Sequence, residues 1–564
     1  MELNLPDLLE AVEASVPERE ALVFRDRHLT WAEFGARVRR FANVLAEAGL
    51  GGRDRGDAAG WESTQDHVAL YLYNGNEYLE GMIGAMAARC AAVNVNYRYR
   101  AAELRHVLTD SGARAVVYHG VFGDRLAEVV DTLPPSTLLL RVEDGSGVPA
   151  APGSLDYEAA LGAASDQLSD RARADRSPDD MYVCYTGGTT GLPKGVLWRQ
   201  ADFLVAALGL RRRDGADFAD LDEAVAATSS GGLRALPAPP LMHGAAHWNA
   251  ISALAAGGTV VIQDDPTRLD PADIWSCVER HRVTSLLIVG DPFARPLIDE
   301  WDRAAAAGRA YDASTLRHVL SGGAVLSPAT KEALLDRLHG VTVVDVLGST
   351  ESGRQGVSQT KHAADAGRGF VSSSTAVVLS EDLSSVVRAS SDEVGWLAQS
   401  GRVPLGYLGD RAKSEATFPV VEGVRYAVAG DRAKVDADGR IVLLGRDSVT
   451  INTGGEKVFA EEVETAVKLH ASVLDAVVCG RPSERWGQEI VAVVSLRDGA
   501  DANANAEQIE ADLRELVRSQ LADFKVPKAV VLVDDVVRSP SGKADYRWAR
   551  EVAAAAGVAP SGST

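Results

Sequence analysis

The sequence predicts an α/β protein with a large N-terminal domain, residues 1–445, and a small α+β C-terminal domain, residues 446–564. Two patterns predict this class. Through most of the chain, short apolar segments alternate with helical patterns, which is typical of βαβ units and a largely parallel sheet. From about residue 395 the texture changes to strands and turns, which predicts a β-rich subdomain. We therefore expect the N-terminal domain to combine parallel βαβ subdomains with this β-rich part.

The first half of the chain shows the alternation clearly. Residues 5–15 have amphipathic helical spacing. Thr30 and Glu33 form a capping box that predicts a helix over 31–48, which Gly49 would end. Beyond it, the pattern predicts strands at 68–73, 92–95, 115–118 and 138–141, with helices at 77–90 and 101–111.

The alternation resumes in the second half. Asp270 and Pro271 suit the N-cap and first position of a helix that reaches about residue 282, and Ser327 and Pro328 begin another. Strands are predicted at 285–289, 318–320 and 341–346.

A hairpin marks the end of the N-terminal domain. Asp438 and Gly439 are a strong turn signal between apolar segments at 426–435 and 441–444. Past a boundary near residue 446, the pattern predicts one helix at 460–469 and strands at 475–479, 491–495 and 529–533.

The composition of the chain indicates which binding partners and which cellular compartment to expect. The 58 basic and 79 acidic residues give a net charge of −21, which argues against nucleic acid and anionic membranes as partners. Cys90, Cys184, Cys277 and Cys479 form no CxxC pair and are expected to be buried thiols in a reducing compartment. The N-terminus lacks a signal-peptide pattern, and the apolar stretches are too short for stable membrane insertion. We expect a cytoplasmic protein.

A glycine-rich segment, TGGTTGLPKG over 186–195, carries the clearest functional signal. It follows residues 182–184, which the apolar pattern predicts to end a buried strand. Closely spaced backbone N–H groups bind anions, hydroxyls add donors and Lys194 adds a positive charge, so we expect a polyphosphate such as ATP. It is not a Walker P-loop, because Leu192 follows Gly191. We expect this loop to meet two others, 321–324 and 348–351, at the carboxyl ends of parallel strands. The alternative is a surface turn without a ligand.

This segment resembles the phosphate-binding signature of the adenylate-forming superfamily, which includes acyl-CoA synthetases, luciferases and peptide-synthetase adenylation domains. The resemblance implies that ATP phosphates lie against Thr186, Gly187, Gly188, Thr189, Thr190, Gly191 and Lys194. It implies that Gly322, Gly323 and Ala324 frame the adenine, and that Gly348, Ser349, Thr350 and Glu351 approach the AMP phosphate, with Glu351 holding magnesium. Leu347 stands where the family has an aromatic residue, so apolar packing would replace stacking there.

Further matches lie toward the C-terminus. The resemblance assigns the ribose hydroxyls to Asp431, ribose or phosphate to Arg446, and the role of catalytic lysine to Lys543, which would act with Glu351 and Thr186. It also implies a mobile C-terminal domain with a hinge at Asp447 and Ser448, although the usual hinge aspartate is displaced by one position.

The same resemblance implies a CoA site and an acyl site. CoA would contact Thr453, Gly454, Gly455, Phe524 and Lys528, although the neighbouring lysines could equally form a solvated face. His243, Ala246 and Gly290 would line the acyl site, where small residues leave room for a medium, long or bulky group. A histidine satisfied by local hydrogen bonds is the alternative for His243.

These matches predict an ATP- and Mg²⁺-dependent acyl-CoA synthetase that joins a carboxylic acid to CoA through an acyl-adenylate. Several local strings look similar to actinobacterial ligases for fatty acids and steroid side chains. Two alternatives stay open: an adenylating enzyme that passes the acyl group to a carrier protein or an amine, and a catalytically silent binder of ATP or acyl groups. The sequence also leaves a homodimer open.

Overall fold

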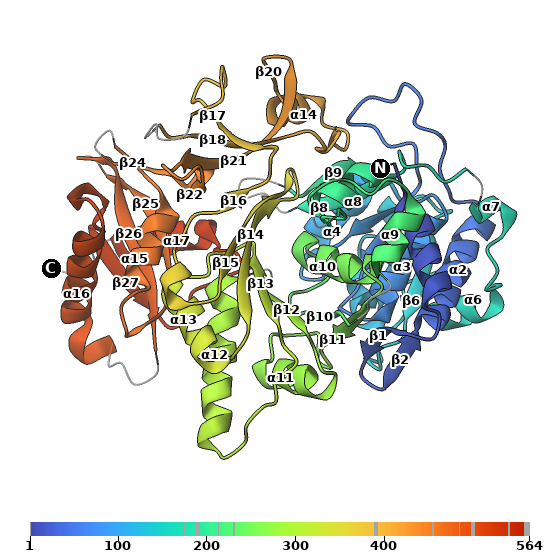
Figure 1. The fold of residues 1–564 in the computed structure, drawn as a ribbon, viewed down its shortest axis with the longest axis horizontal. Coiled ribbons are helices and arrows are strands. Elements are labelled where there is room, and N and C mark those ends of the chain that lie inside the picture. The colour runs from blue at the N-terminus through green and yellow to red at the C-terminus, as the bar shows by residue number, and fades with distance from the viewer. Residues whose placement is uncertain are drawn as a thin grey trace.

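The fold is seen in a computed structural model (Figure 1). It describes residues 2–173, 175–186, 192–212, 214–228, 232–388, 393–453, 456–483, 485–497, 502–539 and 542–557. The predicted α/β class is confirmed: a large N-terminal domain contains two sheets with parallel cores, and a small α+β unit follows it.

The first parallel sheet is built from the predicted alternation. Its strand order is β4-β3-β5-β6-β7, all parallel. The capping box at Thr30 is confirmed, because its hydroxyl accepts from the Glu33 N–H and the Glu33 carboxylate accepts from the Thr30 N–H. The elements are α1 (Leu5–Ser15), α2 (Trp31–Glu47), β3 (His67–Tyr71), α3 (Asn76–Ala87), β4 (Ala91–Asn94), α4 (Ala101–Asp110), β5 (Ala113–His119), α5 (Gly123–Ala127), β6 (Leu138–Val142), β7 (Leu155–Asp156), α6 (Tyr157–Ala163) and α7 (Asp170–Arg173).

The second sheet has nine strands in the order β16-β15-β14-β13-β12-β10-β11-β1-β2. Its centre, from β14 to β1, is parallel, and antiparallel strands close both edges. The elements are β1 (Glu20–Phe24), β2 (Arg27–Thr30), α9 (Leu221–Thr228), β10 (Arg234–Pro237), α10 (Gly244–Ala255), β11 (Thr259–Ile262), α11 (Pro271–Arg280), β12 (Ser285–Ile288), α12 (Gly290–Ala306), β13 (His318–Gly322), α13 (Pro328–Arg337), β14 (Thr342–Ser349), β15 (Gly353–Thr360) and β16 (Val371–Ser372).

The glycine-rich segment does not leave a parallel sheet, and that expectation is wrong. β8 (Met181–Thr186) and β9 (Lys194–Arg199) form an antiparallel hairpin, and β19 (Gly406–Tyr407) completes a separate three-stranded sheet. Both strands of the hairpin are buried and read as continuous apolar runs. Such runs do not show whether a strand belongs to a parallel or an antiparallel sheet. A short helix, α8 (Gln200–Ala206), follows.

The β-rich subdomain and the small C-terminal unit complete the chain. The hairpin turn is confirmed: β21 (Val424–Val435) pairs with β22 (Ile441–Arg446), and Gly439 takes φ +76. The subdomain also contains β17 (Ala376–Leu379), β18 (Gly395–Ser400), α14 (Arg411–Thr417) and β20 (Val420–Val421). The C-terminal sheet joins β23 (Ile451–Thr453), β24 (Glu456–Val458), β25 (Val473–Ser483), β26 (Gly487–Leu496) and β27 (Ala529–Val533), with α15 (Ala460–Val467), α16 (Ala502–Gln520) and α17 (Tyr546–Gly557).

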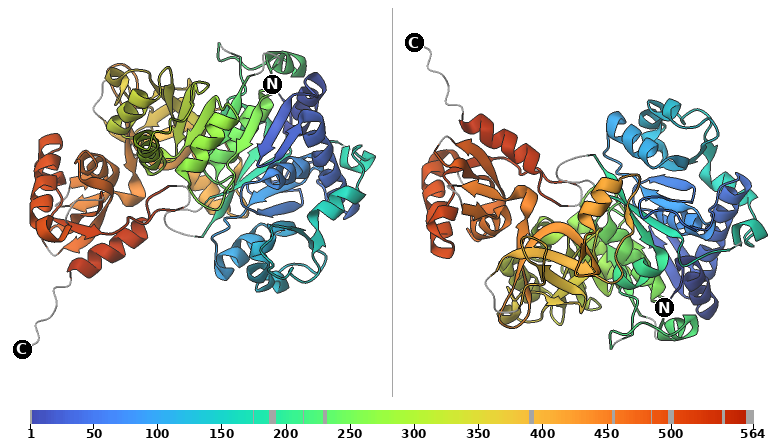
Figure 2. Two further views of the ribbon diagram at one scale, coloured as in Figure 1. Left: turned by 90° about the horizontal axis from the view of Figure 1, so that it is seen from below. Right: turned by 90° about the horizontal axis from the view of Figure 1, so that it is seen from above.

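The C-terminal unit has an apolar core of its own, which includes Val463, Val478 and Leu513. In Figures 1 and 2 it lies at one end of the molecule, next to α12 and the β-rich subdomain and away from the first parallel sheet. The boundary at 445/446 and the mobility of this unit stay predictions. None of the described helices is long and apolar enough to cross a membrane.

Candidate active site

Lys543 lies among charged groups from three other parts of the chain. Its ammonium interacts electrostatically with Arg446, Glu351 and Asp431, and its Cε lies 4.0 Å from the point where a Cβ on Gly323 would stand. The Lys543 side chain is exposed to solvent, although protein atoms surround its ammonium. Desolvation and the Arg446 guanidinium therefore lower the pKa of Lys543, while the two carboxylates oppose the shift. The structure thus brings Lys543 close to residues that lie 97 to 192 positions before it in the chain.

Asp431 and Arg446 face each other across the β21–β22 hairpin. Arg446 Nε donates to Asp431 Oδ1 at 3.1 Å. Burial raises the pKa of the Asp431 carboxyl, and the Arg446 charge works against that rise. The pair places a carboxylate and a guanidinium near Lys543, a suitable set for the hydroxyls and phosphate of a nucleotide.

Thr350 and Glu351 sit at the tight turn between β14 and β15, where Gly348 pairs with Arg354. A Cβ on Gly348 would stand 2.2 Å from the Gly353 oxygen, so the turn requires glycine there. Side chains from the other sheet hold this turn: Tyr407 Oη donates to Glu351 Oε1 at 2.9 Å, and Trp198 Nε1 donates to the Thr350 oxygen at 2.9 Å. The turn after β14 therefore contacts the three-stranded sheet that carries the β8–β9 hairpin, and the meeting of the three predicted loops stays a prediction.

Thr186 on β8 pairs with Lys194 on β9 at the last position of the β8–β9 hairpin before its loop. Lys194 forms an ion pair with Asp410, the N-cap residue of α14. The predicted phosphate contacts at Gly187, Gly188, Thr189, Thr190 and Gly191 lie outside the described residues. Asp410 was not predicted, because no local pattern joins it to a residue 216 positions away.

The predicted adenine segment follows β13 directly. Gly323 takes φ +88, which favours glycine, and Ala324 is partly buried against the core beside it. Gly290, predicted to line the acyl site, packs on this segment instead: a Cβ there would stand 2.4 Å from the Val325 oxygen. Leu347 is buried in the core of the β-rich subdomain, in line with apolar packing at that position.

His243 interacts electrostatically with Lys543. Burial lowers the pKa of its imidazole to about 3, and the charges of Lys543 and Arg98 add to this. Its Nε2 is buried without a hydrogen-bond partner among the described residues, so local hydrogen bonds do not satisfy that atom. Ala246 is fully buried in the main apolar core. The His243 imidazole is therefore neutral and has an unused polar atom in the site.

An aromatic group stands beside His243. Trp248 Nε1 donates to Tyr182 Oη at 2.6 Å, and the Tyr182 ring stacks on Phe203 at 3.8 Å. A Cβ on Gly244 would lie 3.6 Å from the Trp248 ring and 3.7 Å from both Cys184 Sγ and Thr350 Oγ1. The indole thus forms a fixed wall beside the Thr350 turn.

All four cysteines are free and buried. Burial raises the pKa of the thiols of Cys184 and Cys277 to about 12 and that of Cys479 to about 11, and it raises the pKa of Cys90 as well. The thiol nearest the site is Cys184, on β8.

A cavity of about 400 Å³ lies between the N-terminal domain and the C-terminal unit. Its wall includes Arg98, Pro240, Phe293 and Arg295 from one side and Arg538 and Gly542 from the other. The loop that carries Lys543 therefore borders an open space between the two parts.

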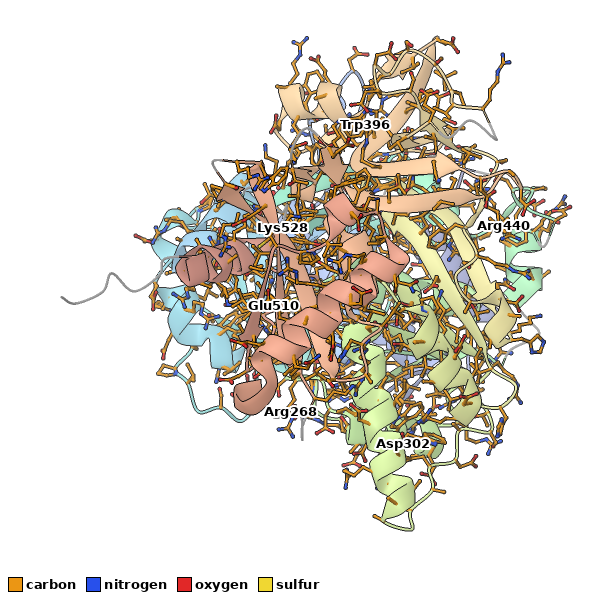
Figure 3. All side chains as sticks on the ribbon, turned by 90° about the vertical axis from the view of Figure 1, so that its left-hand side faces the viewer. Arg268, Asp302, Trp396, Arg440, Glu510 and Lys528 are labelled. Carbon is orange, nitrogen blue, oxygen red and sulfur yellow. The ribbon has the colours of Figure 1, made fainter. Side chains whose placement is uncertain are left out.

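The described CoA and hinge residues lie in other elements of the C-terminal unit. Thr453 is buried on β23, Phe524 is 38% exposed, and the Lys528 ammonium lies 5.7 Å from the centre of the Trp486 ring (Figure 3 labels Lys528). Trp486 is exposed and was not predicted. Gly454 and Gly455 lie outside the described residues. Asp447 and Ser448 form a 3₁₀ turn after β22.

Comparison with known proteins identifies the family of this chain. The AMP-binding enzyme family matches residues 9–401, and its C-terminal domain matches residues 462–543. Relatives include a medium-chain acyl-CoA ligase of Mycobacterium avium, 46% identical over 98% of both chains, and a 3-oxocholest-4-en-26-oate–CoA ligase of Rhodococcus rhodochrous, 39% identical over 98% of this chain and 96% of the relative.

Solved structures share the fold at lower identity. The anthranilate CoA ligase in complex with anthranoyl-AMP gives a TM-score of 0.80 at 20% identity over 98% of each chain. ATP-bound MatB from Rhodopseudomonas palustris gives 0.76 at 22% identity, over 97% of this chain and 99% of MatB. The resemblance that the motifs predicted is confirmed, and the chain belongs to the AMP-binding enzyme family.

Proposed function

We propose that this enzyme is an AMP-forming acyl-CoA ligase that uses ATP to join a carboxylic acid to CoA. The convergence of Lys543 with Glu351, Asp431 and Arg446 at the cleft carries this proposal. It is supported by relatives that are named acyl-CoA ligases and that match this chain over nearly their whole length.

In the first half-reaction, a carboxylate oxygen attacks the α-phosphorus of ATP and the bond to pyrophosphate breaks. Lys543 would stabilise the negative charge that develops on the phosphoryl oxygens, and Asp431 with Arg446 would orient the ribose. Thr186, the hairpin loop and Lys194 would hold the departing phosphates, for which Lys194 would leave Asp410. His243 Nε2 would face the acyl carboxylate end of the site.

Magnesium fits at Glu351. Mg²⁺ prefers oxygen ligands and is commonly bound by one or two carboxylates together with substrate phosphates. Tyr407 holds one Glu351 oxygen at 2.9 Å and so fixes the direction of the carboxylate toward the cleft. When bound there, the ion would supply positive charge to the ATP phosphates.

In the second half-reaction, the CoA thiolate attacks the acyl carbon and AMP leaves. This step would follow a rotation about Asp447 and Ser448 that removes Lys543 and brings the segment of Thr453, Gly454 and Gly455 to the site. The exposed ring of Phe524 and the Lys528 ammonium beside Trp486 would bind the CoA nucleotide.

The acyl group would be of medium or greater length, or bulky. The relatives named for medium-chain and 3-oxocholest-4-en-26-oate substrates support this class. The cytoplasm would supply ATP and CoA and keep the four buried thiols reduced. A homodimer stays a prediction, which sedimentation of the purified protein would test.

An AMP-release assay tests the function. The enzyme is supplied with ATP, Mg²⁺ and CoA, together with short, medium, long, aromatic and steroidal carboxylic acids, and the products are identified. We expect CoA thioesters of medium or bulky acids and equal amounts of AMP. AMP release that requires an amine or a carrier protein instead of CoA would favour the alternative acceptor. Absence of carboxylate-dependent pyrophosphate exchange with every acid would refute adenylation. A preference for acetate would refute the acyl class.

A further inference from the structure

We propose that Arg295 is a positioning residue for the adenylation step, because it fastens the C-terminal unit in the orientation that delivers Lys543. This inference rests on the proposed function, in which the same unit must later rotate away. Arg295 belongs to α12 of the N-terminal domain, and its hydrogen bonds and ion pair involve none of the described residues assigned to ATP.

Arg295 bonds three backbone carbonyls of the C-terminal unit. Its Nη1 donates to the Leu474 oxygen at 2.6 Å and to the Val473 oxygen at 3.2 Å, and its Nη2 donates to the Lys468 oxygen at 3.3 Å. The residue is only 8% exposed, and its guanidinium also lies 3.4 Å from the buried Asp291 carboxylate. A buried cation with this many partners is held in one place.

The acceptors explain the strength of the contact. Lys468 caps the C-terminal end of α15, where helix carbonyls lack intrahelical partners and carry partial negative charge. Val473 and Leu474 begin β25. Because a planar guanidinium presents several donors in fixed directions, it can join the helix end to the strand start.

A short path leads from these acceptors to the catalytic loop. Asp475, the residue after Leu474, accepts from Arg538 Nη2 at 2.8 Å. Arg538 Nη1 donates to the Gly542 oxygen at 3.0 Å, and Gly542 directly precedes Lys543. The carbonyls that Arg295 holds are therefore tied to the backbone that carries the lysine.

The first turns of α12 also touch the catalytic loop itself. A Cβ on Gly542 would lie 3.1 Å from the Val289 side chain and 3.5 Å from the Phe293 ring. The start of α12 thus packs against Gly542. Arg295, on the same helix, hydrogen-bonds the neighbouring part of the C-terminal unit. Any rotation about residues 447–448 that moved Lys543 away would carry the three acceptors away from Arg295.

Another ion pair between the same two parts is weaker. Arg497 and Asp299 are 3.8 Å apart, and their side chains are 40% and 56% exposed. Exposed pairs of this kind contribute little. Lys457 and Glu381, 3.4 Å apart, also join the two parts, and both side chains are exposed. The buried Arg295 contact is therefore the stronger tie between them.

The test compares Arg295→Ala with Arg303→Ala on the same helix. Arg303 is 68% exposed and pairs with Glu300 three residues before it, so its removal leaves the contact between the parts intact. Pyrophosphate exchange measures the first half-reaction, and thioester formation from a supplied acyl-adenylate measures the second. We expect Arg295→Ala to lower kcat for exchange about 10- to 100-fold, with KM for ATP nearly unchanged and the second half-reaction undiminished.

Orientation is measured without activity. Dyes attached through Asp302→Cys on α12 and Glu510→Cys on α16, both labelled in Figure 3, report the distance between the parts, because the four natural thiols are buried. We expect Arg295→Ala to shift and broaden this distance in the ligand-free enzyme. Arg295→Lys should restore exchange in part, since an ammonium can still reach one carbonyl.

Separate outcomes would overturn the two proposals. Equal loss of both half-reactions, or an unchanged distance distribution in Arg295→Ala that still melts like Arg303→Ala, would refute the positioning role. Absence of exchange in the unmodified enzyme would refute the proposed function, while the distance measurement would still decide whether Arg295 fastens the C-terminal unit.

Discussion

Replacing Asp475 by asparagine should destabilise the C-terminal unit in a pH-dependent way. Arg538 Nη2 lies 2.8 Å from one Asp475 oxygen, and Lys468 Nζ lies 3.2 Å from the same carboxylate. Asp475 is 19% exposed, and the two cations are 12% and 9% exposed. The substitution keeps the size of the side chain and removes the charge that both cations share.

The magnitude follows from the pKa of the carboxyl. Burial alone would raise it, but hydrogen bonds from Arg538 and the charges of Lys468 and Arg538 lower the pKa of Asp475 from 3.8 to about 2. A shift of this size corresponds to about 2 kcal/mol of stability at neutral pH. Because the folded-state pKa is depressed, this contribution is fully present above pH 3.8 and is lost as the pH falls toward 2.

Urea unfolding of the full chain at pH 7 and at pH 2.5 measures the effect, with a probe in the C-terminal unit. We expect Asp475→Asn to cost about 2 kcal/mol at pH 7 and much less at pH 2.5. Asp523→Asn is the matched control, since Asp523 is 87% exposed and 3.6 Å from Arg518, and should cost less than about 0.5 kcal/mol. An equal loss at both pH values, or none at pH 7, would refute the electrostatic reasoning.

Four further substitutions test the site and its surroundings. Lys543→Ala should reduce acyl-adenylate formation about 10²- to 10³-fold, while thioester formation from supplied acyl-adenylate persists. Tyr407→Phe should weaken the apparent magnesium affinity of adenylation about tenfold, and Glu351→Gln more strongly, because the phenol orients the carboxylate. Burial raises the pKa of Glu461, which accepts from the Arg446 N–H, to about 7. The protonated carboxyl is therefore favoured in the folded state, and stability is lost as the pH rises through 7. Glu461→Gln should accordingly be more stable than the natural chain at pH 8 by roughly 1–3 kcal/mol and similar to it near pH 5, by urea unfolding.

Specific outcomes would contradict these predictions. Parallel loss of both half-reactions in Lys543→Ala would contradict its assignment to adenylation alone. Unchanged magnesium dependence in Glu351→Gln would remove this residue from the metal site. A stability difference for Glu461→Gln that is the same at pH 5 and pH 8 would show that packing, and not ionisation, is responsible.

Much of the fold was predictable because helix starts and turns depend on residues that are neighbours in the sequence. The Thr30 capping box, the Asp270–Pro271 helix start and the Asp438–Gly439 turn each depend on neighbouring residues, and all three are found where the sequence predicts them. Membership of a sheet is not local. The hairpin of the glycine-rich segment was therefore assigned to the wrong type of sheet.

The site residues also fall into those that local motifs predicted and those that they did not. Glu351, Asp431 and Lys543 were named from motifs, and the structure places them near one another. Tyr407, Asp410 and Arg295 carry no such signal, since an isolated tyrosine, aspartate or arginine has many ordinary roles. Their contacts join segments that meet only in the folded chain.

The buried thiol of Cys184 bears on the fate of the reactive intermediate. An acyl-adenylate is an activated ester that a neighbouring thiolate could attack. Cys184 Sγ lies close to Thr350 across Gly244, yet with a pKa of about 12 only about one thiol in 10⁵ is ionised at pH 7. In this protonated state the thiol is a poor nucleophile toward the intermediate. A substitution that admitted water to this wall would lower the barrier to self-acylation, and mass spectrometry would detect the acyl group on Cys184.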